Sequence, residues 1–171
     1  YASAAKYIAT SCMEVYHDAR VYDTGMVVII EIMGRHAGWL AASAALASAY
    51  GCGPDLIYLP ETDFDMDQFL TDVDRVYKEK GNCLVAVSEG IHYPDGSFVS
   101  EASTSATDGF GHAQLGGLAP TLADLAKTRT GAKVRGIELS LLQRCAAHCA
   151  SGTDIAESFL SGKTAVEAAV A

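Results

Sequence analysis

Residues 26–39 have the sequence MVVIIEIMGRHAGW. The first part, Met26–Met33, is a short run of almost entirely apolar, mostly β-branched side chains, which is typical of a central strand in a parallel sheet covered on both faces. Gly34 interrupts the run and Arg35 follows it. Ligands of open α/β sheets bind beyond the carboxyl ends of the strands. This stretch therefore predicts an α/β fold and places a candidate binding loop at its end.

The rest of the chain alternates between strand and helix patterns. Short apolar runs predict strands, and helical apolar spacing or composition predicts helices. The strands are expected at residues 56–59, 83–87 and 134–139, and the helices at residues 4–19, 39–50, 66–79, 118–127 and 154–169. Asp65 and Asp154 are expected to cap two of these helices, and the polar stretch 92–108 to form a surface loop. The alternation predicts a three-layer α/β/α arrangement around a mostly parallel, Rossmann-like sheet, with residues 1–171 as one domain.

The composition excludes several classes of protein. The 171 residues include 21 acidic and 12 basic side chains, which gives a net charge of −9. Half of the residues are hydrophobic and the mean hydropathy is +0.16, so the chain is not disordered, while its apolar runs are too short to span a bilayer. The acidic balance argues against a nucleic-acid partner. The chain starts at Tyr1 without an initiator Met or a signal peptide, so we expect a fragment of a longer protein.

The cysteines do not form a recognisable framework. Their number is odd and they are scattered through expected helices and strands, which argues against secreted disulfides and for a reducing, cytoplasmic location. Cys145, His148 and Cys149 could place three soft ligands on one helical face, but a structural zinc site needs a fourth ligand. Buried or half-buried thiols are therefore the favoured interpretation.

Polar residues follow or adjoin all four expected strands. Gly34 and Arg35 follow the first strand, Glu61 the second and residues 88–90 the third, while the fourth begins near Arg135 and is followed by residues 143–144. Arginines offer planar, bidentate donors to phosphate, and Glu89 can accept hydrogen bonds from sugar hydroxyls. We expect Arg35, Arg135 and Arg144 to gather at one edge of the sheet, and the combination indicates a site for a phosphorylated polyol.

Simpler interpretations compete with this one. An arginine after a strand is often only a solvated charge, and Glu89 could merely cap the turn that follows it. Glu31, inside an apolar strand, is expected to pair with a helix N–H group or an arginine. His36 and His112 lie in glycine-bounded loops and could act as acid–base groups or simply as surface or packing side chains.

The same residues carry a family resemblance. The stretch Glu31–Trp39 resembles the sugar-phosphate motif of the phosphofructokinase family, and residues 55–61 and 85–90 follow in that family's order. Residues 142–144 are similar to its Gln-Arg element, with Arg135 nine residues before Arg144. Residues 111–117 and 138–145 most resemble the branch that contains pyrophosphate-dependent members. The resemblance covers essentially the whole chain and implies the second, substrate-binding domain of such an enzyme.

The resemblance implies a role for each matching residue. Met33–Arg35 would hold the sugar of fructose 6-phosphate, with Arg35 also supporting the transition state at the transferred phosphoryl group. Glu89 would bind the sugar hydroxyls and Arg144 the 6-phosphate. Arg135 would reach the same phosphate across a subunit interface, which implies a homo-oligomer. Two departures are Met26, where the family often has an arginine, and Ser140 or Leu141, where bacterial ATP-dependent members have a histidine.

The resemblance also implies parts that these residues do not contain. The family's Gly-Gly-Asp loop and its Thr-Ile-Asp-Asn-Asp stretch do not occur, so neither the catalytic aspartate nor a metal ligand can be assigned. The implied parent enzyme transfers a phosphoryl group from ATP or pyrophosphate, with Mg²⁺, to the 1-hydroxyl of fructose 6-phosphate in glycolysis. Its product is fructose 1,6-bisphosphate, and we expect the isolated chain to be inactive.

Two other functions compete with this expectation. The first is a stand-alone regulatory module that binds sugar phosphates without catalysis. The second is a dinucleotide-binding domain, which is disfavoured because no G-x-G-x-x-G follows a strand.

Overall fold

The computed structural model describes residues 1–100 and 117–171. Its centre is a four-stranded sheet in the order β2-β3-β1-β4, and every neighbouring pair is parallel. The strands are β1 (Val27–Ile32), β2 (Leu56–Tyr58), β3 (Cys83–Ser88) and β4 (Val134–Glu138). All side chains of β1 and β3 are buried, as the continuous apolar run predicted. The predicted α/β fold with a parallel sheet is confirmed.

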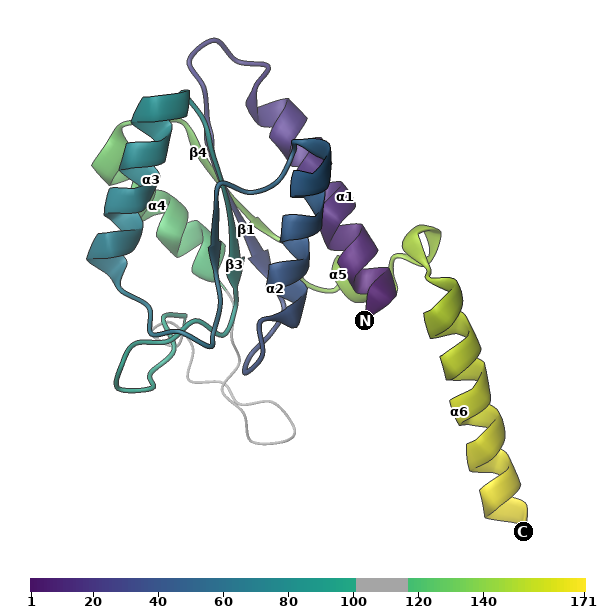
Figure 1. Ribbon diagram of the computed structural model, residues 1–171. Coiled ribbons are helices and arrows are strands. Elements are labelled where there is room, and N and C mark those ends of the chain that lie inside the picture. Colours follow the sequence, from purple (N-terminus) through teal and green to yellow (C-terminus); the bar gives the residue numbers. More distant parts are fainter. Residues whose placement is uncertain (101–116) are drawn as a thin grey trace.

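Helices cover both faces of this sheet (Figure 1). On one face lie α3 (Met66–Lys80) and α4 (Leu118–Thr130), and on the other α1 (Ala2–Ala19), α2 (Trp39–Ser43) and the 3₁₀ helix η1 (Ala44–Tyr50). Alternate residues of β1 divide between the two cores, since Val27 and Ile29 pack with α3 and α4, and Val28 and Ile30 with α1 and α2. The sheet therefore has a separate apolar core on each face.

The helix expected over residues 39–50 is divided into an α-helical and a 3₁₀ part. Ser43 lies at the junction, and its hydroxyl donates to the carbonyl of Leu40 at 2.6 Å. A side-chain bond to a carbonyl three residues back competes with the regular α-helical pattern. Gly51, in the left-handed conformation at φ +71°, ends the segment.

The expected cap of α3 is confirmed and that of α6 (Gly152–Val170) is wrong. Asp65 accepts a hydrogen bond of 2.9 Å from the Gln68 N–H. Helix α6 begins earlier, after Ser151, and the carboxylate of Asp154 binds Ser3 on α1 instead. This carboxylate satisfies an N–H group in the first turn of α1, which explains why it does not cap its own helix.

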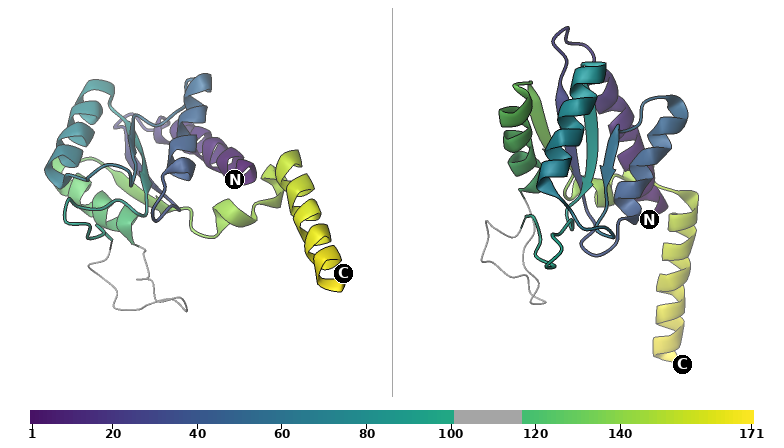
Figure 2. Two further views of the ribbon diagram at one scale, coloured as in Figure 1. Left: turned by 60° about the horizontal axis from the view of Figure 1, so that its bottom comes forward. Right: turned by 60° about the vertical axis from the view of Figure 1, so that its left-hand side comes forward.

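Helix α6 runs away from the sheet, as two further views also show (Figure 2). It has no buried residue, and Ile155, Phe159 and Val166 are all more than half exposed. Two short helices, α5 (Leu142–Cys145) and η3 (Ala147–Cys149), connect it to β4. Within the described ranges, no helix combines the length and the apolar character needed to cross a bilayer.

Part of the expected surface loop 92–108 lies outside the described residues. In the described part, Val99 and Ser100 are buried, at 8% and 5% exposed. The apolar core on the α3 and α4 side includes Val99, so residues 99–100 pack inward rather than lying on the surface.

Candidate functional site

The carboxyl ends of β1 and β3 meet in a close backbone packing. Gly34 has φ +150°, and its carbonyl accepts a hydrogen bond of 2.5 Å from the Ser88 hydroxyl. A Cβ atom on Gly90 would overlap the carbonyl of Arg35. A side chain at Gly90 would therefore push the two loops apart, whereas at Gly34 a side chain is excluded by the positive φ and by the Ala37 carbonyl, 2.6 Å from where a Cβ would lie.

Glu89 is tied to the loop that carries Arg35. Its Oε1 accepts a hydrogen bond of 3.2 Å from the Gly34 N–H, and its own N–H donates to the carbonyl of Ile32 at 2.8 Å. A carboxylate has about four lone-pair positions, so Glu89 retains capacity for a ligand hydroxyl. The predicted neighbours Gly34 and Glu89 are thus brought together.

Arg35 lines a cavity of about 340 Å³ beyond the end of β1. The other lining residues come from the following loop, from the end of β2 and from the segment after β3: His36, Pro60, Gly90, His92, Gly96 and Phe98. The rings of His36 and Phe98 lie 5.9 Å apart between centroids. His36 therefore lies beside Arg35 and packs on Phe98, whereas His112 lies outside the described residues.

Met33 is joined to the segment that carries Arg144. The Met33 N–H donates to Oε1 of Gln143 at 3.2 Å, and Gln143 Nε2 donates to the Ser140 carbonyl at 2.9 Å. Gln143 is 2% exposed, so both bonds are shielded from water. This amide positions the exposed Arg144 next to the sugar loop expected at Met33–Arg35.

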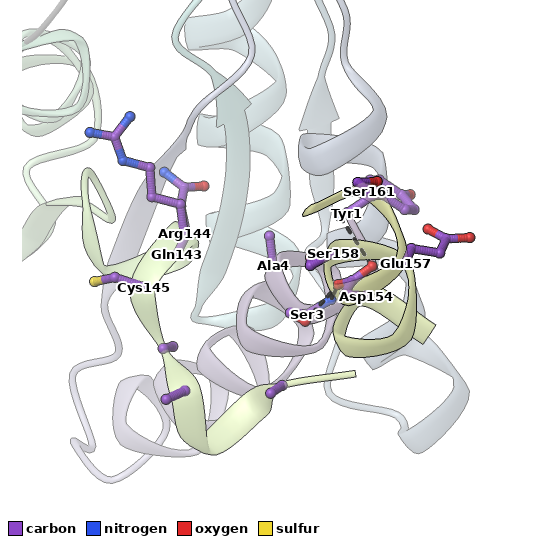
Figure 3. Close-up of a pocket in the computed structure, with 13 residues that line it drawn as sticks. Tyr1, Ser3, Ala4, Gln143, Arg144, Cys145, Asp154, Glu157, Ser158 and Ser161 are labelled. Atoms are coloured by element: carbon purple, nitrogen blue, oxygen red, sulfur yellow. Dashed lines mark hydrogen bonds and ion pairs between the residues drawn. The ribbon is translucent and has the colours of Figure 1, made fainter. Parts of the chain in front are cut away.

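Arg144 lines a larger pocket of about 700 Å³ between α1, α5 and α6. Gln143 and Arg144 lie on one side of this pocket, and the hydrogen-bonded pair Ser3 and Asp154 lies on the other (Figure 3). Asp154 Oδ2 accepts two hydrogen bonds of 2.6 Å, from the N–H and the hydroxyl of Ser3, and these bonds lower the pKa of its carboxyl. One wall of the pocket therefore carries the cationic Arg144, and the other carries the Asp154 carboxylate, which is already hydrogen-bonded to Ser3.

The expectation that three arginines gather at one edge of the sheet is wrong for Arg135. It pairs with Val28 near the amino end of β1 and lines a different cavity with Glu14 and Asp18 of α1. Since a strand rises about 3.3 Å per residue, Arg135 lies roughly 10 Å along β4 from the carboxyl end of that strand. Within one chain, Arg35 and Arg144 are at the carboxyl edge and Arg135 is not.

Glu31 was expected to pair with either a helix N–H group or an arginine, and it pairs with a helix N–H group. Its Oε2 accepts from the Ala119 N–H at 2.8 Å, in the first turn of α4, and the residue is 2% exposed. Burial raises the pKa of Glu31 to about 7, against the opposing effect of the Ala119 N–H and with a further rise from Glu138 and Glu89. Glu31 therefore has a structural role, in which it accepts a hydrogen bond at the N-terminal end of α4.

A metal centre finds no ligand set in the described ranges. Within residues 1–100 and 117–171, no group of three or more His, Cys, Asp or Glu side chains could hold a metal ion. Cys145 is exposed and Cys149 is buried, while the His148 ring packs edge-on against Tyr7 at 6.1 Å. The zinc alternative, which the sequence already disfavoured, has no support among the described residues, and the favoured interpretation of buried or half-buried thiols is confirmed for Cys149 and wrong for Cys145.

Two features of this edge were missed in the sequence. The Gly38 N–H donates to Oε1 of Glu61 at 2.6 Å, which ties the end of the loop that follows β1 to the segment after β2. His92 lines the same cavity as Arg35. Its place two residues after Gly90, close behind a strand end, was a signal that could have drawn attention to it.

Comparisons with known proteins agree on one family. A family model described as Phosphofructokinase matches residues 1–169. The pyrophosphate--fructose 6-phosphate 1-phosphotransferase of Xanthomonas campestris pv. campestris is 48% identical over 176 residues, covering 99% of this chain and 41% of the relative. The protein of that name from Halomonas elongata is 43% identical over 173 residues, with the same coverage of both chains. The chain thus spans about two fifths of the length of these curated relatives.

A solved structure agrees as well. The crystal structure of the pyrophosphate-dependent phosphofructokinase from Marinobacter aquaeolei superposes with a TM-score of 0.74 at 36% sequence identity. The match covers 98% of this chain and 38% of that one.

Proposed function

The chain belongs to the phosphofructokinase family, and from this membership we propose that it supplies the fructose 6-phosphate site of an enzyme that phosphorylates the 1-hydroxyl of that sugar. One observation carries the proposal. The loop at Met33–Arg35 is hydrogen-bonded on one side to Glu89 and on the other to Gln143, the neighbour of Arg144. The loop is thereby bonded to a hydroxyl acceptor, Glu89, and to the residue that directly precedes the cation Arg144.

Each residue has a part in binding that follows from its chemistry. Glu89 accepts hydrogen bonds from sugar hydroxyls, and Arg144 binds the 6-phosphate with its guanidinium fork. The main chain at Met33 and Gly34 lies against the sugar, because Gly34 has no side chain to keep it away. Arg35 stabilises the negative charge that develops on the transferred phosphoryl group. Binding and orientation of the sugar are the contribution of these residues to the reaction.

Pyrophosphate is the proposed donor, and the names of the Xanthomonas and Halomonas relatives support it. Fructose 1,6-bisphosphate is the product. The described residues do not fit a Mg²⁺ site, since they hold no cluster of carboxylates that could ligate it. We propose that the metal ligands and the catalytic base lie outside the described residues, and that the isolated chain binds the sugar phosphate without turning it over.

Arg135 is proposed to bind the 6-phosphate of a neighbouring subunit. Its exposed position near the amino end of β1 supports a role between subunits rather than within one. In that arrangement the protein is a homo-oligomer, which the mass from light scattering measures directly. A monomer in the presence of fructose 6-phosphate would contradict this part of the proposal.

Calorimetric titration of fructose 6-phosphate tests the site. We expect binding to the wild-type chain and a loss of about tenfold to a hundredfold in affinity for Arg144→Ala, because a hydrogen bond to a charged group contributes about 1.5–3 kcal/mol. Arg129→Ala, an exposed arginine in the last turn of α4, is the matched control and should bind as the wild type does. Equal affinity in all three proteins, or no binding to the wild type, would contradict the proposal. A coupled assay of the isolated chain should give no turnover above background.

A further inference from the structure

A tight turn at residues 92–98 lies against the cavity that Arg35 lines. His92 and Phe98 form an antiparallel bridge, and the Tyr93 N–H donates to the Ser97 carbonyl at 2.9 Å. The carbonyl of His92 accepts from the Phe64 N–H at 2.8 Å, so its main chain is also held from the segment after β2. The main chain of His92 is therefore fixed by bonds on both sides of the turn.

The cavity between this turn and the loop that carries Arg35 is suited to an anion. Its titratable lining residues are Arg35, His36 and His92, and none of the described residues that line it is an aspartate or a glutamate. A negatively charged group in this cavity would meet hydrogen-bond donors among the described lining residues.

The imidazole of His92 has one nitrogen to offer a ligand. Its Nδ1 is buried and has no hydrogen-bond partner among the described residues. Burying an unpaired acceptor costs less than burying an unpaired N–H donor, so the favoured neutral tautomer carries its proton on Nε2. Because Nδ1 is closed off from solvent and the ring lines the cavity, Nε2–H is the donor that a ligand in the cavity can reach.

We propose that His92 is a binding residue for the phosphoryl group at the reacting end of the substrate, to which its Nε2–H donates a hydrogen bond beside the guanidinium of Arg35. The inference rests on the proposed function. Fructose 1,6-bisphosphate carries a phosphate at each end, and the two arginines of the carboxyl edge line different cavities. Arg144 takes the 6-phosphate in one cavity, and the cavity with Arg35 and His92 takes the phosphoryl group that pyrophosphate donates.

Two substitutions of His92 separate a hydrogen bond from a packing role. His92→Leu fills space without a donor, whereas the amide nitrogen of His92→Gln stands near the position of Nε2. His148→Gln is the matched control, since His148 is an exposed histidine that packs on Tyr7 of α1. Thermal denaturation first establishes that each variant is folded.

Pyrophosphate, inorganic phosphate and fructose 6-phosphate are then titrated separately into each protein. For pyrophosphate we expect the Kd to rise about tenfold or more in His92→Leu and to stay within about threefold of the wild type in His92→Gln and in His148→Gln. For inorganic phosphate, the Kd should rise in the same order among the variants, by smaller factors. The Kd for fructose 6-phosphate should be unchanged in all variants. In the wild type, the ¹⁵N resonance of His92 Nε2 should shift on adding pyrophosphate.

The outcomes separate this inference from the proposed function. Equal pyrophosphate affinity in the wild type and His92→Leu, or an unmoved Nε2 resonance, would overturn the role of His92. A loss that appears for fructose 6-phosphate and not for pyrophosphate would also overturn it, because the cavity would then hold the sugar. Failure of the wild type to bind fructose 6-phosphate, with His92-dependent binding of pyrophosphate retained, would contradict the sugar site and leave the phosphoryl site standing.

Discussion

The main-chain N–H of Met33 donates a hydrogen bond of 3.2 Å to Oε1 of Gln143, across 110 residues of sequence. Because Gln143 is buried and also donates to the Ser140 carbonyl, its side chain has a single orientation. Ser140 has a positive φ of 43°, an uncommon conformation for a residue other than glycine, so the backbone before α5 is closely constrained. The position of Arg144 relative to the sugar loop depends on this amide.

Gln143→Met removes both hydrogen bonds and keeps the length of the side chain. The Met33 N–H then loses its partner, and we expect the free energy of unfolding to fall by about 1–3 kcal/mol. The affinity for fructose 6-phosphate should fall at the same time, since the neighbouring Arg144 is no longer held. Urea denaturation and calorimetry measure the two effects. Leu142→Ala, at 59% exposed, is the control and should change stability by less than about 0.5 kcal/mol.

Gly90→Ala should separate the two loops at the carboxyl edge. The added methyl group would overlap the Arg35 carbonyl, which is main chain and cannot turn aside. We expect a loss of stability of about 1–3 kcal/mol, the usual cost of overpacking, and a loss of ligand binding through the displaced Arg35. Gly162→Ala on α6 is the control, because a Cβ there meets nothing within 4 Å. A Gly90→Ala protein with wild-type stability and affinity would show that the loops are not in contact.

The sheet was predictable because β1 and β3 are buried along their whole length, and a strand covered on both faces must be apolar throughout. That Glu31 would pair with a helix N–H or an arginine followed from the same fact, since a carboxylate in such a strand needs a donor, and the structure shows that the donor is the Ala119 N–H. Arg135 was placed wrongly although it stands at the start of β4, because in a sheet of parallel strands every strand start lies at the amino edge, opposite the edge that holds Arg35 and Arg144. The strand–helix alternation already implied parallel strands, so this position could have been predicted from the sequence.

The bond between Ser3 and Asp154 could not be predicted, because the two residues are 151 apart in the sequence. The local pattern around Asp154 instead resembled the cap of its own helix. Asp154→Asn should weaken the attachment of α6 to the start of α1, with faster proteolysis and amide exchange around Ser151 and Ser3. The hydrogen bonds from Ser3 lower the pKa of the Asp154 carboxyl below its ordinary value of 3.8. The stability that this carboxylate contributes is therefore present above pH 3.8 and is lost as the pH falls through the lowered pKa. Glu157→Gln, one turn further along α6, is the control, and equal exchange in both variants would contradict the prediction.

The buried Glu31 should make the protein more stable as the pH falls from about 8 to 5. Its pKa is raised from 4.5 to about 7 in the folded chain, first by burial, so the folded protein takes up a proton in this range and the unfolded chain does not. The gain reaches roughly 3 kcal/mol at 1.36 kcal/mol per pKa unit. Glu31→Gln keeps a carbonyl acceptor for the Ala119 N–H and cannot titrate. Urea denaturation at each pH should show this variant losing that part of the slope and exceeding the wild type in stability at pH 8, whereas identical slopes would show that Glu31 is ionised throughout.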